Sequence, residues 1–152
     1  MGGIFDTPYR GGFVGNSHRF ALRVYFEDTD TAGIVYYANY LRFMERARSD
    51  MLRCVGIDQR VVMERGEGVY AVADLSIRYR GSARLDDDLV VVSELRQVRA
   101  AAVVIQQRVM RGAEILTDAT VTAAFITNEG RPKRQPREWV GIFERLVTEG
   151  DE

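Results

Sequence analysis

One long amphipathic helix, set between one strand pattern and four more, limits the folds open to this chain more than any other feature. Between residues 37 and 55, apolar side chains recur every three or four positions, which is typical of a helix that buries one face. Gly56 follows as a natural helix end. The apolar face comprises Tyr37, Tyr40, Leu41, Met44, Ala47, Met51, Leu52 and Val55, and the polar face comprises Arg42, Glu45, Arg46, Ser49, Asp50 and Arg53.

Strand patterns lie on both sides of this helix. Residues 19–26 alternate apolar and polar side chains, which predicts a strand with one buried face. A weaker helix is expected at 58–65, and Pro136 opens a short final helix. After the weaker helix, four further segments read as strands separated by short turns, and they are expected at 69–80, 89–98, 102–110 and 115–127.

This order of elements predicts an α+β fold with two layers. Strands joined by short turns pair antiparallel, and the helix crossover sets the first strand beside a partner that does not neighbour it in sequence. One long helix then packs on one curved sheet. We expect a single domain at 19–147, preceded by a flexible, Gly-rich lead-in at 1–18 and followed by a tail at 148–152.

Composition and charge exclude several classes of protein. Apolar residues make up 46% of the 152 residues, and no apolar run approaches the roughly 18 residues that a spanning helix needs. The 21 basic and 22 acidic residues nearly cancel, so the chain has no electrostatic footprint for nucleic acid. A single cysteine and the lack of a signal segment indicate a cytoplasmic protein.

The single histidine and the single cysteine suggest no catalytic or metal site. His18 falls in the expected lead-in, where a solvated side chain is the ordinary outcome, so no positioned base is expected for a Ser-His-Asp or Cys-His site. Cys54 falls on the long helix and is expected to be a small packed residue. With one residue of each kind, no zinc site is expected.

A carboxylate at the junction between the first strand and the long helix is the remaining candidate for chemistry. Asp30 lies a few residues before the expected helix, whose N-terminus carries unpaired N–H groups and a partial positive charge. Such an end can keep a carboxylate ionised and polarise a carbonyl oxygen. Gly33 would let a substrate approach the backbone. The alternative is that Asp28 and Asp30 only cap the turn.

The segment around Asp30 resembles the signature of the 4-hydroxybenzoyl-CoA thioesterase family. The similarity is carried by Val24-Tyr25-Phe26-Glu27-Asp28-Thr29-Asp30-Thr31-Ala32-Gly33-Ile34-Val35-Tyr36-Tyr37-Ala38-Asn39-Tyr40 and continues to Arg48. It extends less specifically from about Arg19 to Val147, and the branch that the chain resembles most is that of the Tol–Pal-associated acyl-CoA thioesterases. The resemblance implies the hotdog fold, in which a curved antiparallel sheet of about five strands wraps one long central helix.

The resemblance also implies roles for individual residues. Asp30 would be the catalytic carboxylate, and the backbone N–H of Tyr37 would donate to the thioester oxygen. Arg99 and Arg134 would hold the phosphates of CoA, and neither a metal nor a bound cofactor is implied. Many members of the Tol–Pal-associated branch have a histidine at the position of Tyr37, so an imidazole has no role here. A lysine that the hydroxybenzoyl enzyme has corresponds to Ala101 in this chain, so the CoA phosphates are expected to be bound more weakly or by a different arrangement of residues.

The expected activity is therefore hydrolysis of a short-chain or aromatic acyl-CoA to a free acid and CoA. Asp30 would act as nucleophile or as general base, and both roles stay open. A second hypothesis is a non-catalytic module that binds acyl-CoA or an acyl carrier and works with an envelope complex. Active sites in the family lie between subunits, so a homotetramer or homodimer is expected, with a peripheral association with envelope proteins as a further expectation.

Overall fold

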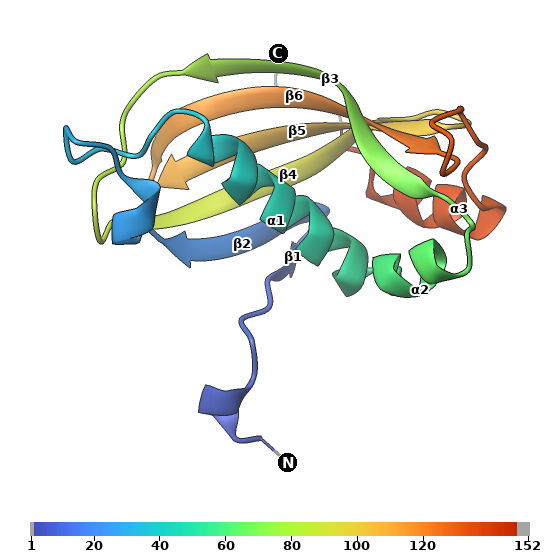
Figure 1. The fold of residues 1–152 in the computed structure, drawn as a ribbon, viewed down its shortest axis with the longest axis horizontal. Coiled ribbons are helices and arrows are strands. Elements are labelled where there is room, and N and C mark those ends of the chain that lie inside the picture. The colour runs from blue at the N-terminus through green and yellow to red at the C-terminus, as the bar shows by residue number, and fades with distance from the viewer. Residues whose placement is uncertain (1, 149–152) are drawn as a thin grey trace.

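One long helix crosses the concave face of a curved, six-stranded antiparallel sheet (Figure 1). A computed structural model describes residues 2–148 of the chain. In chain order its elements are η1 Ile4–Asp6, β1 Gly12–Val14, β2 Ser17–Arg23, η2 Phe26–Asp28, α1 Asn39–Cys54, α2 Gln59–Glu64, β3 Val69–Tyr79, β4 Asp88–Val98, β5 Ala102–Arg111, β6 Glu114–Ile126 and α3 Arg137–Leu146.

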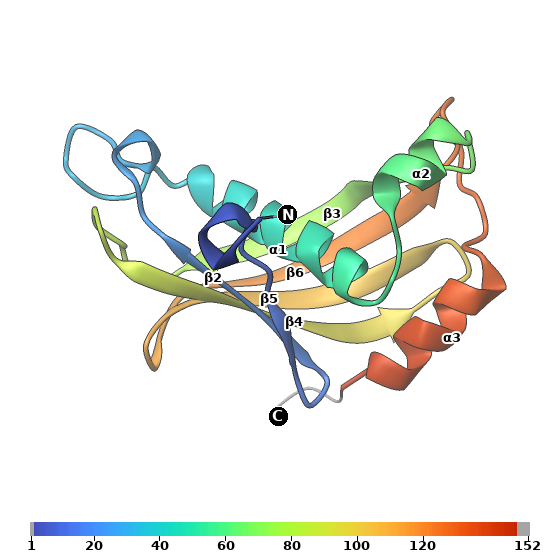
Figure 2. The same cartoon turned by 90° about the horizontal axis from the view of Figure 1, so that it is seen from below.

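The strand order is β1-β2-β4-β5-β6-β3, with every neighbouring pair antiparallel. The strand before α1 therefore pairs with β4 across the helix crossover, as its pattern predicts. The two edges of the sheet are the short β1 and the long β3. Figure 2 shows α3 at the end of the sheet away from the start of α1, where it packs beside β4.

The packing of α1 on the sheet follows from its sequence period. Its buried side chains recur every three or four residues and face alternate residues of the central strands. Phe43 and Met44 contact the core beneath the first half of the helix, and Met51 contacts a second cluster near α3. The α+β hotdog fold predicted from the sequence is confirmed, with six strands in place of about five.

Several boundaries differ from the sequence prediction, and the first strand, predicted to reach residue 26, ends at Arg23 because Phe26–Asp28 form the short helix η2. The helix begins at Asn39 and ends at Cys54, two residues later and one residue earlier than predicted. The sheet begins before Arg19, because β1 and the first residues of β2 pair within what was predicted to be a flexible lead-in. The predicted tail of 148–152 lies, apart from Thr148, outside the described residues.

The prediction that His18 is a solvated residue is wrong. His18 lies in β2, its side chain is 0% exposed, and its Nε2 atom is 2.7 Å from the Asp50 carboxylate. Asp50, which the helical period places on the polar face, is itself only 2% exposed. Its partners from outside α1 are the His18 ring and the backbone N–H of Gly11, which donates at 3.0 Å, and the Cys54 thiol one turn along α1 also donates to it at 3.5 Å.

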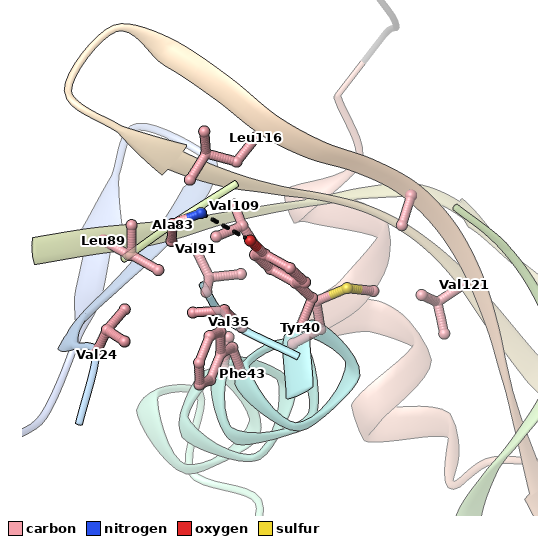
Figure 3. Close-up of a cluster of buried hydrophobic side chains, with 13 residues drawn as sticks. Val24, Val35, Tyr40, Phe43, Ala83, Leu89, Val91, Val109, Leu116 and Val121 are labelled. Carbon is pink, nitrogen blue, oxygen red and sulfur yellow. Dashed lines mark hydrogen bonds between the residues drawn. The ribbon is translucent and has the colours of Figure 1, made fainter. Parts of the chain in front are cut away.

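A second buried polar contact connects α1 to the loop that follows β3. The backbone N–H of Ala83 donates to the Tyr40 hydroxyl oxygen at 2.9 Å, and both residues are buried (Figure 3). Burial raises the pKa of the Tyr40 hydroxyl above its usual value. This hydrogen bond fixes the 80–87 loop against the first turn of the helix.

Among residues 2–148, no helix combines the length and the apolar character that crossing a membrane requires.

We expect Tyr40→Phe to lower the free energy of unfolding by about 1–3 kcal/mol, because it leaves the buried Ala83 N–H without an acceptor. Chemical denaturation would measure the change. Tyr25→Phe is the matched control, since Tyr25 is exposed and its hydroxyl makes no hydrogen bond within the described residues, and it should be nearly neutral. Equal stabilities for Tyr40→Phe and the unmodified protein would show that the hydroxyl contributes nothing.

Candidate active site

Asp30 lies at the first position of a tight turn between β2 and α1. Its carbonyl oxygen accepts from the Gly33 N–H at 3.0 Å, and its carboxylate Oδ1 accepts from the Ala32 N–H at 2.8 Å. Gly33 has a φ of 78°, a conformation that favours glycine, so the turn itself requires this residue. The Asp30 side chain is exposed, and within the described residues only the Ala32 N–H donates to it. One carboxylate oxygen therefore holds the turn while the other faces outward, free for a ligand.

The loop that carries Asp30 is held at both ends. The Asp28 carbonyl oxygen accepts from the Tyr36 N–H at 3.0 Å and from the Asn39 side-chain amide at 2.9 Å. The Val35 N–H donates to the Ala83 carbonyl oxygen at 2.9 Å. These bonds attach the turn to the first residue of α1 and to the loop after β3, so its position is set by the fold.

The start of α1 presents hydrogen-bond donors without capping side chains. Its N-cap is Ala38, which makes no side-chain hydrogen bond, and the first turn holds no acidic residue. The Tyr37 N–H has no acceptor within residues 2–148. The partial positive charge of the helix end is therefore available to an external oxygen. Tyr37 precedes the helix, whereas the sequence analysis placed it on the first turn.

Four tyrosines gather beside this helix end. The Tyr37 ring lies 4.9 Å from Tyr36 and 6.0 Å from Tyr79, and Tyr79 is 5.8 Å from Tyr40, all measured between ring centroids. The Tyr79 hydroxyl also donates to the Tyr37 carbonyl oxygen at 3.1 Å. Tyr79 could not be identified from the sequence, because its contact with Tyr37 spans 42 residues and has no local signal. The anchoring role of the Asn39 amide was also not predicted. Its only local signal is a polar, hydrogen-bonding side chain at the first residue of the helix.

Arg99 and Arg134 are brought together, but at the opposite end of the sheet from Asp30. Both are exposed. Between them, the buried Gln135 donates from its side-chain amide to the Arg99 carbonyl oxygen at 2.8 Å and accepts from the Tyr70 hydroxyl at 2.5 Å. This corner lies beside the first residues of β3, whereas Tyr37 and Asp30 lie beside its last residue, Tyr79. β3 has 11 residues and so spans about 35 Å.

Two cavities lie between α1 and the sheet. The first, of about 210 Å³, has a mixed lining in which Glu45, Arg48 and Ser49 lie among apolar side chains such as Leu52 and Ile105. The second, also of about 210 Å³, lies between α1 and the middle of β3, lined in part by Val72 and Leu75. Burial lowers the pKa of the Arg48 guanidinium, which donates to the buried Gln107 at 2.8 Å. Of the two cavities along α1, the one at the middle of β3 is therefore mainly apolar, and the other combines polar and apolar groups.

Comparison with known proteins agrees with this architecture. The thioesterase superfamily matches residues 32–117. The chain is 39% identical over 132 residues to an acyl-CoA thioesterase YbgC of Haemophilus influenzae, covering 86% of this chain and 97% of that one. It is 33% identical over 129 residues to an acyl-CoA thioester hydrolase YbgC of Escherichia coli, covering 84% and 96%.

Solved structures show the same fold. A probable thioesterase of Bartonella henselae superposes with a TM-score of 0.76 at 33% identity, covering 79% of this chain and 99% of that one. A 1,4-dihydroxy-2-naphthoyl-CoA thioesterase of Synechocystis gives a TM-score of 0.78 at 22% identity, covering 84% and 95%, a likeness that concerns the fold alone.

A curved antiparallel sheet around one long helix is the hotdog fold, and the relatives that share it with this chain at 33–39% identity are thioesterases. This chain belongs to the thioesterase superfamily, and it is a thioester hydrolase.

Proposed function

We propose that this protein hydrolyses acyl-CoA thioesters to a free acid and CoA, with Asp30 as the reacting carboxylate. The observation that carries the proposal is the loop in which an outward-facing carboxylate precedes a free N–H and an uncapped helix end. Relatives that share 33–39% of their residues with this chain are named acyl-CoA thioesterases or thioester hydrolases. The four tyrosines beside the helix end and the modest cavities favour short-chain or aromatic acyl groups.

In the proposed mechanism, the thioester oxygen accepts a hydrogen bond from the Tyr37 N–H. The positive end of α1 then stabilises the negative charge that develops on this oxygen. Asp30 either attacks the carbonyl carbon or removes a proton from an attacking water. When Asp30 attacks, the carbon–sulfur bond breaks as a mixed anhydride forms between Asp30 and the acyl group, and a water then hydrolyses this anhydride to the free acid and Asp30. When Asp30 acts as the base, the water adds to the carbonyl carbon and the carbon–sulfur bond breaks directly. In both routes CoA leaves as the thiolate and becomes the thiol with a proton from the consumed water. Gly33, whose positive φ forms the turn, leaves the backbone beside Asp30 open to the substrate.

We further propose that a complete site takes its two halves from two copies of the chain. In one chain, the Asp30 loop and the two arginines lie at opposite ends of β3. β3 is an edge strand, and its Val72, Leu75 and Tyr79 side chains are 50%, 36% and 44% exposed. Long apolar edges of this kind need covering. Antiparallel pairing of two β3 edges would set the Tyr79 end of one copy against the Val69 end of the other, beside the partner's arginine corner.

The finer placement of the protein rests on sequence resemblance. We propose that it belongs near the 4-hydroxybenzoyl-CoA thioesterase family and its Tol–Pal-associated branch, with a peripheral association with envelope proteins. The signature around Asp30 supports this placement. We also propose a cytoplasmic location, which the single cysteine supports because it fits a reducing compartment.

Asp30→Asn should lower kcat by about 10²–10⁴-fold, the usual contribution of a positioned acid, base or nucleophile. Release of free thiol from a panel of acyl-CoAs would measure it. The asparagine oxygen can still accept from the Ala32 N–H, so thermal stability should change little. Asp28→Asn is the matched control, since Asp28 accepts from the Tyr25 N–H and an amide oxygen can do the same. Near-normal turnover of Asp30→Asn would leave Asp30 as a turn residue only.

Arg99→Ala and Arg134→Ala should each raise KM for acyl-CoA while kcat stays nearly unchanged, the sign of lost uniform binding. Both arginines are exposed, so the effect should shrink at high salt, where such charges are screened. Steady-state kinetics with a truncated thioester that lacks the nucleotide supplies the control, because this substrate has no phosphates to lose. Equal losses on both substrates would mean that the arginines act through the structure.

Mixing Asp30→Asn chains with Arg134→Ala chains should restore activity if each site uses two copies. About half of the dimers in an equal mixture are mixed, and each mixed dimer has one of its two sites with both native residues. The mixture should therefore reach about a quarter of the unmodified activity at low substrate. Co-expression and thiol release would test this, with light scattering to follow assembly as a dimer or tetramer. A monomeric mass at micromolar concentration, or a mixture no better than the mean of its parents, would contradict the shared site.

A further inference from the structure

A second cluster of reactive side chains lies under the other end of α1, away from the Asp30 turn. His18 Nε2 is 2.7 Å from Asp50 Oδ2 and 3.9 Å from Cys54 Sγ, and Asp50 Oδ2 is 3.5 Å from Cys54 Sγ. Asp50 and Cys54 are one helical turn apart on α1, and His18 reaches them from β2. We call these three residues the His18 cluster. One cysteine and one histidine in the chain gave no expectation of a zinc site, and the helical period separately placed Asp50 on the polar face of α1.

The His18 cluster is largely shielded from solvent, and a backbone carbonyl oxygen lies beside it, as in a metal-binding site. His18 and Asp50 are fully or almost fully buried, and Cys54 is half-buried. The Gly11 carbonyl oxygen is 3.5 Å from Cys54 Sγ and could be a fourth ligand beside the nitrogen, oxygen and sulfur atoms of the cluster. A side chain at Gly11 would place Cβ 2.8 Å from the Asp50 carboxylate and 2.3 Å from the Arg19 carbonyl oxygen, so only glycine allows this approach.

We propose that the His18 cluster binds one zinc-like divalent cation through His18 Nε2, Asp50 Oδ2 and Cys54 Sγ, with the Gly11 carbonyl oxygen or water as the fourth ligand. The three separations define a triangle whose centre lies about 2 Å from each ligand atom, close to the usual zinc distances to nitrogen, oxygen and sulfur. Opening the His18–Asp50 separation by about half an ångström would bring the angle at the ion near tetrahedral. Imidazole, carboxylate and thiolate together favour zinc over calcium or magnesium.

Protonation at the cluster follows from burial. Burial lowers the pKa of His18 despite the nearby Asp50, so the ring is neutral and can offer a lone pair at neutral pH. Burial also raises the pKa of the Cys54 thiol, against the lowering effect of the nearby Arg10. Binding through sulfur must therefore release the thiol proton, and the imidazole must move its single proton from Nε2, where it faces the Asp50 carboxylate, to Nδ1. This Nδ1 atom is buried without a partner in the described residues, so it lacks the orienting hydrogen bond that usually strengthens metal binding.

The proposed ion would connect the N-terminal strands to the helix. His18 belongs to β2, Gly11 directly precedes β1, and the other two ligands belong to the last turns of α1. The site is separate from the Asp30 turn, so its occupancy should change stability and leave thiol release from acyl-CoA largely unaffected.

The test uses cobalt as a spectroscopic substitute for zinc. Cys54 is the only cysteine of the chain, so a thiolate-to-cobalt charge-transfer band can come from no other residue. We expect the full chain to develop this band with one cobalt ion per chain, and zinc in excess to remove it. Zinc should raise the Tm of the unmodified protein, and a chelator should reverse the rise. Because one proton is released, the affinity should increase about tenfold for each unit of pH below the thiol pKa.

Cys54→Ser is the decisive variant, because it removes the thiolate and keeps the size of the side chain. It should fold normally, show no charge-transfer band and lose the zinc-dependent rise in Tm. His18→Ala serves only as a supplement, since it removes the nearest partner of the buried Asp50 carboxylate, empties space in the core and is expected to destabilise the fold. If the unmodified protein shows neither the band nor the Tm shift, or if Cys54→Ser keeps the full Tm shift, the cluster is a buried hydrogen-bonded pair with a neighbouring thiol and the metal site is wrong.

Discussion

The contact between the apolar face of α1 and the concave face of the sheet is the interaction on which the rest of the molecule depends. Phe43, Met44 and Ala47 fill the space that the curvature of the sheet leaves, and alternate side chains of β4, β5 and β6 face them. Because the helix is fixed along its whole length, its N-terminal end has one position relative to the sheet. Hydrogen bonds from Asn39 to the Asp28 carbonyl oxygen and from Val35 to the Ala83 carbonyl oxygen then fix the turn that carries Asp30 relative to this helix end.

Burying one helix against one sheet also brings polar groups into the interior, and each of the main ones has a partner from another element. Asp50 meets His18 from β2, and Gln107 from β5 meets both Arg48 and the Met44 carbonyl oxygen of α1. Such pairs stabilise little compared with apolar contacts, but removing one member leaves a buried group unsatisfied. They therefore define the rotation of α1 on the sheet more strictly than apolar packing alone could.

The open edge of the sheet links architecture to the proposed chemistry. β3 carries the proposed catalytic end at Tyr79 and the proposed phosphate-binding end at Tyr70, about 30 Å apart at the rise of an extended strand. A single chain leaves these two ends separate and the edge uncovered. Pairing two identical edges in antiparallel fashion resolves both difficulties at once, because the twofold relation places each end beside its complement.

The sequence by itself determined the elements whose periods are local. The alternation at 69–80 and 102–110 and the helical stripe after Tyr37 predicted three elements to within two residues at each end, and the resemblance of the segment around Asp30 predicted membership of the thioesterase superfamily. Tertiary structure alone decided that Asp50 turns inward, that His18 is buried, and that β3 becomes the exposed edge. A residue's hydrophobic period describes only its own element. Whether a polar side chain can be buried depends on a partner that a distant segment supplies, and local patterns contain no information about that partner.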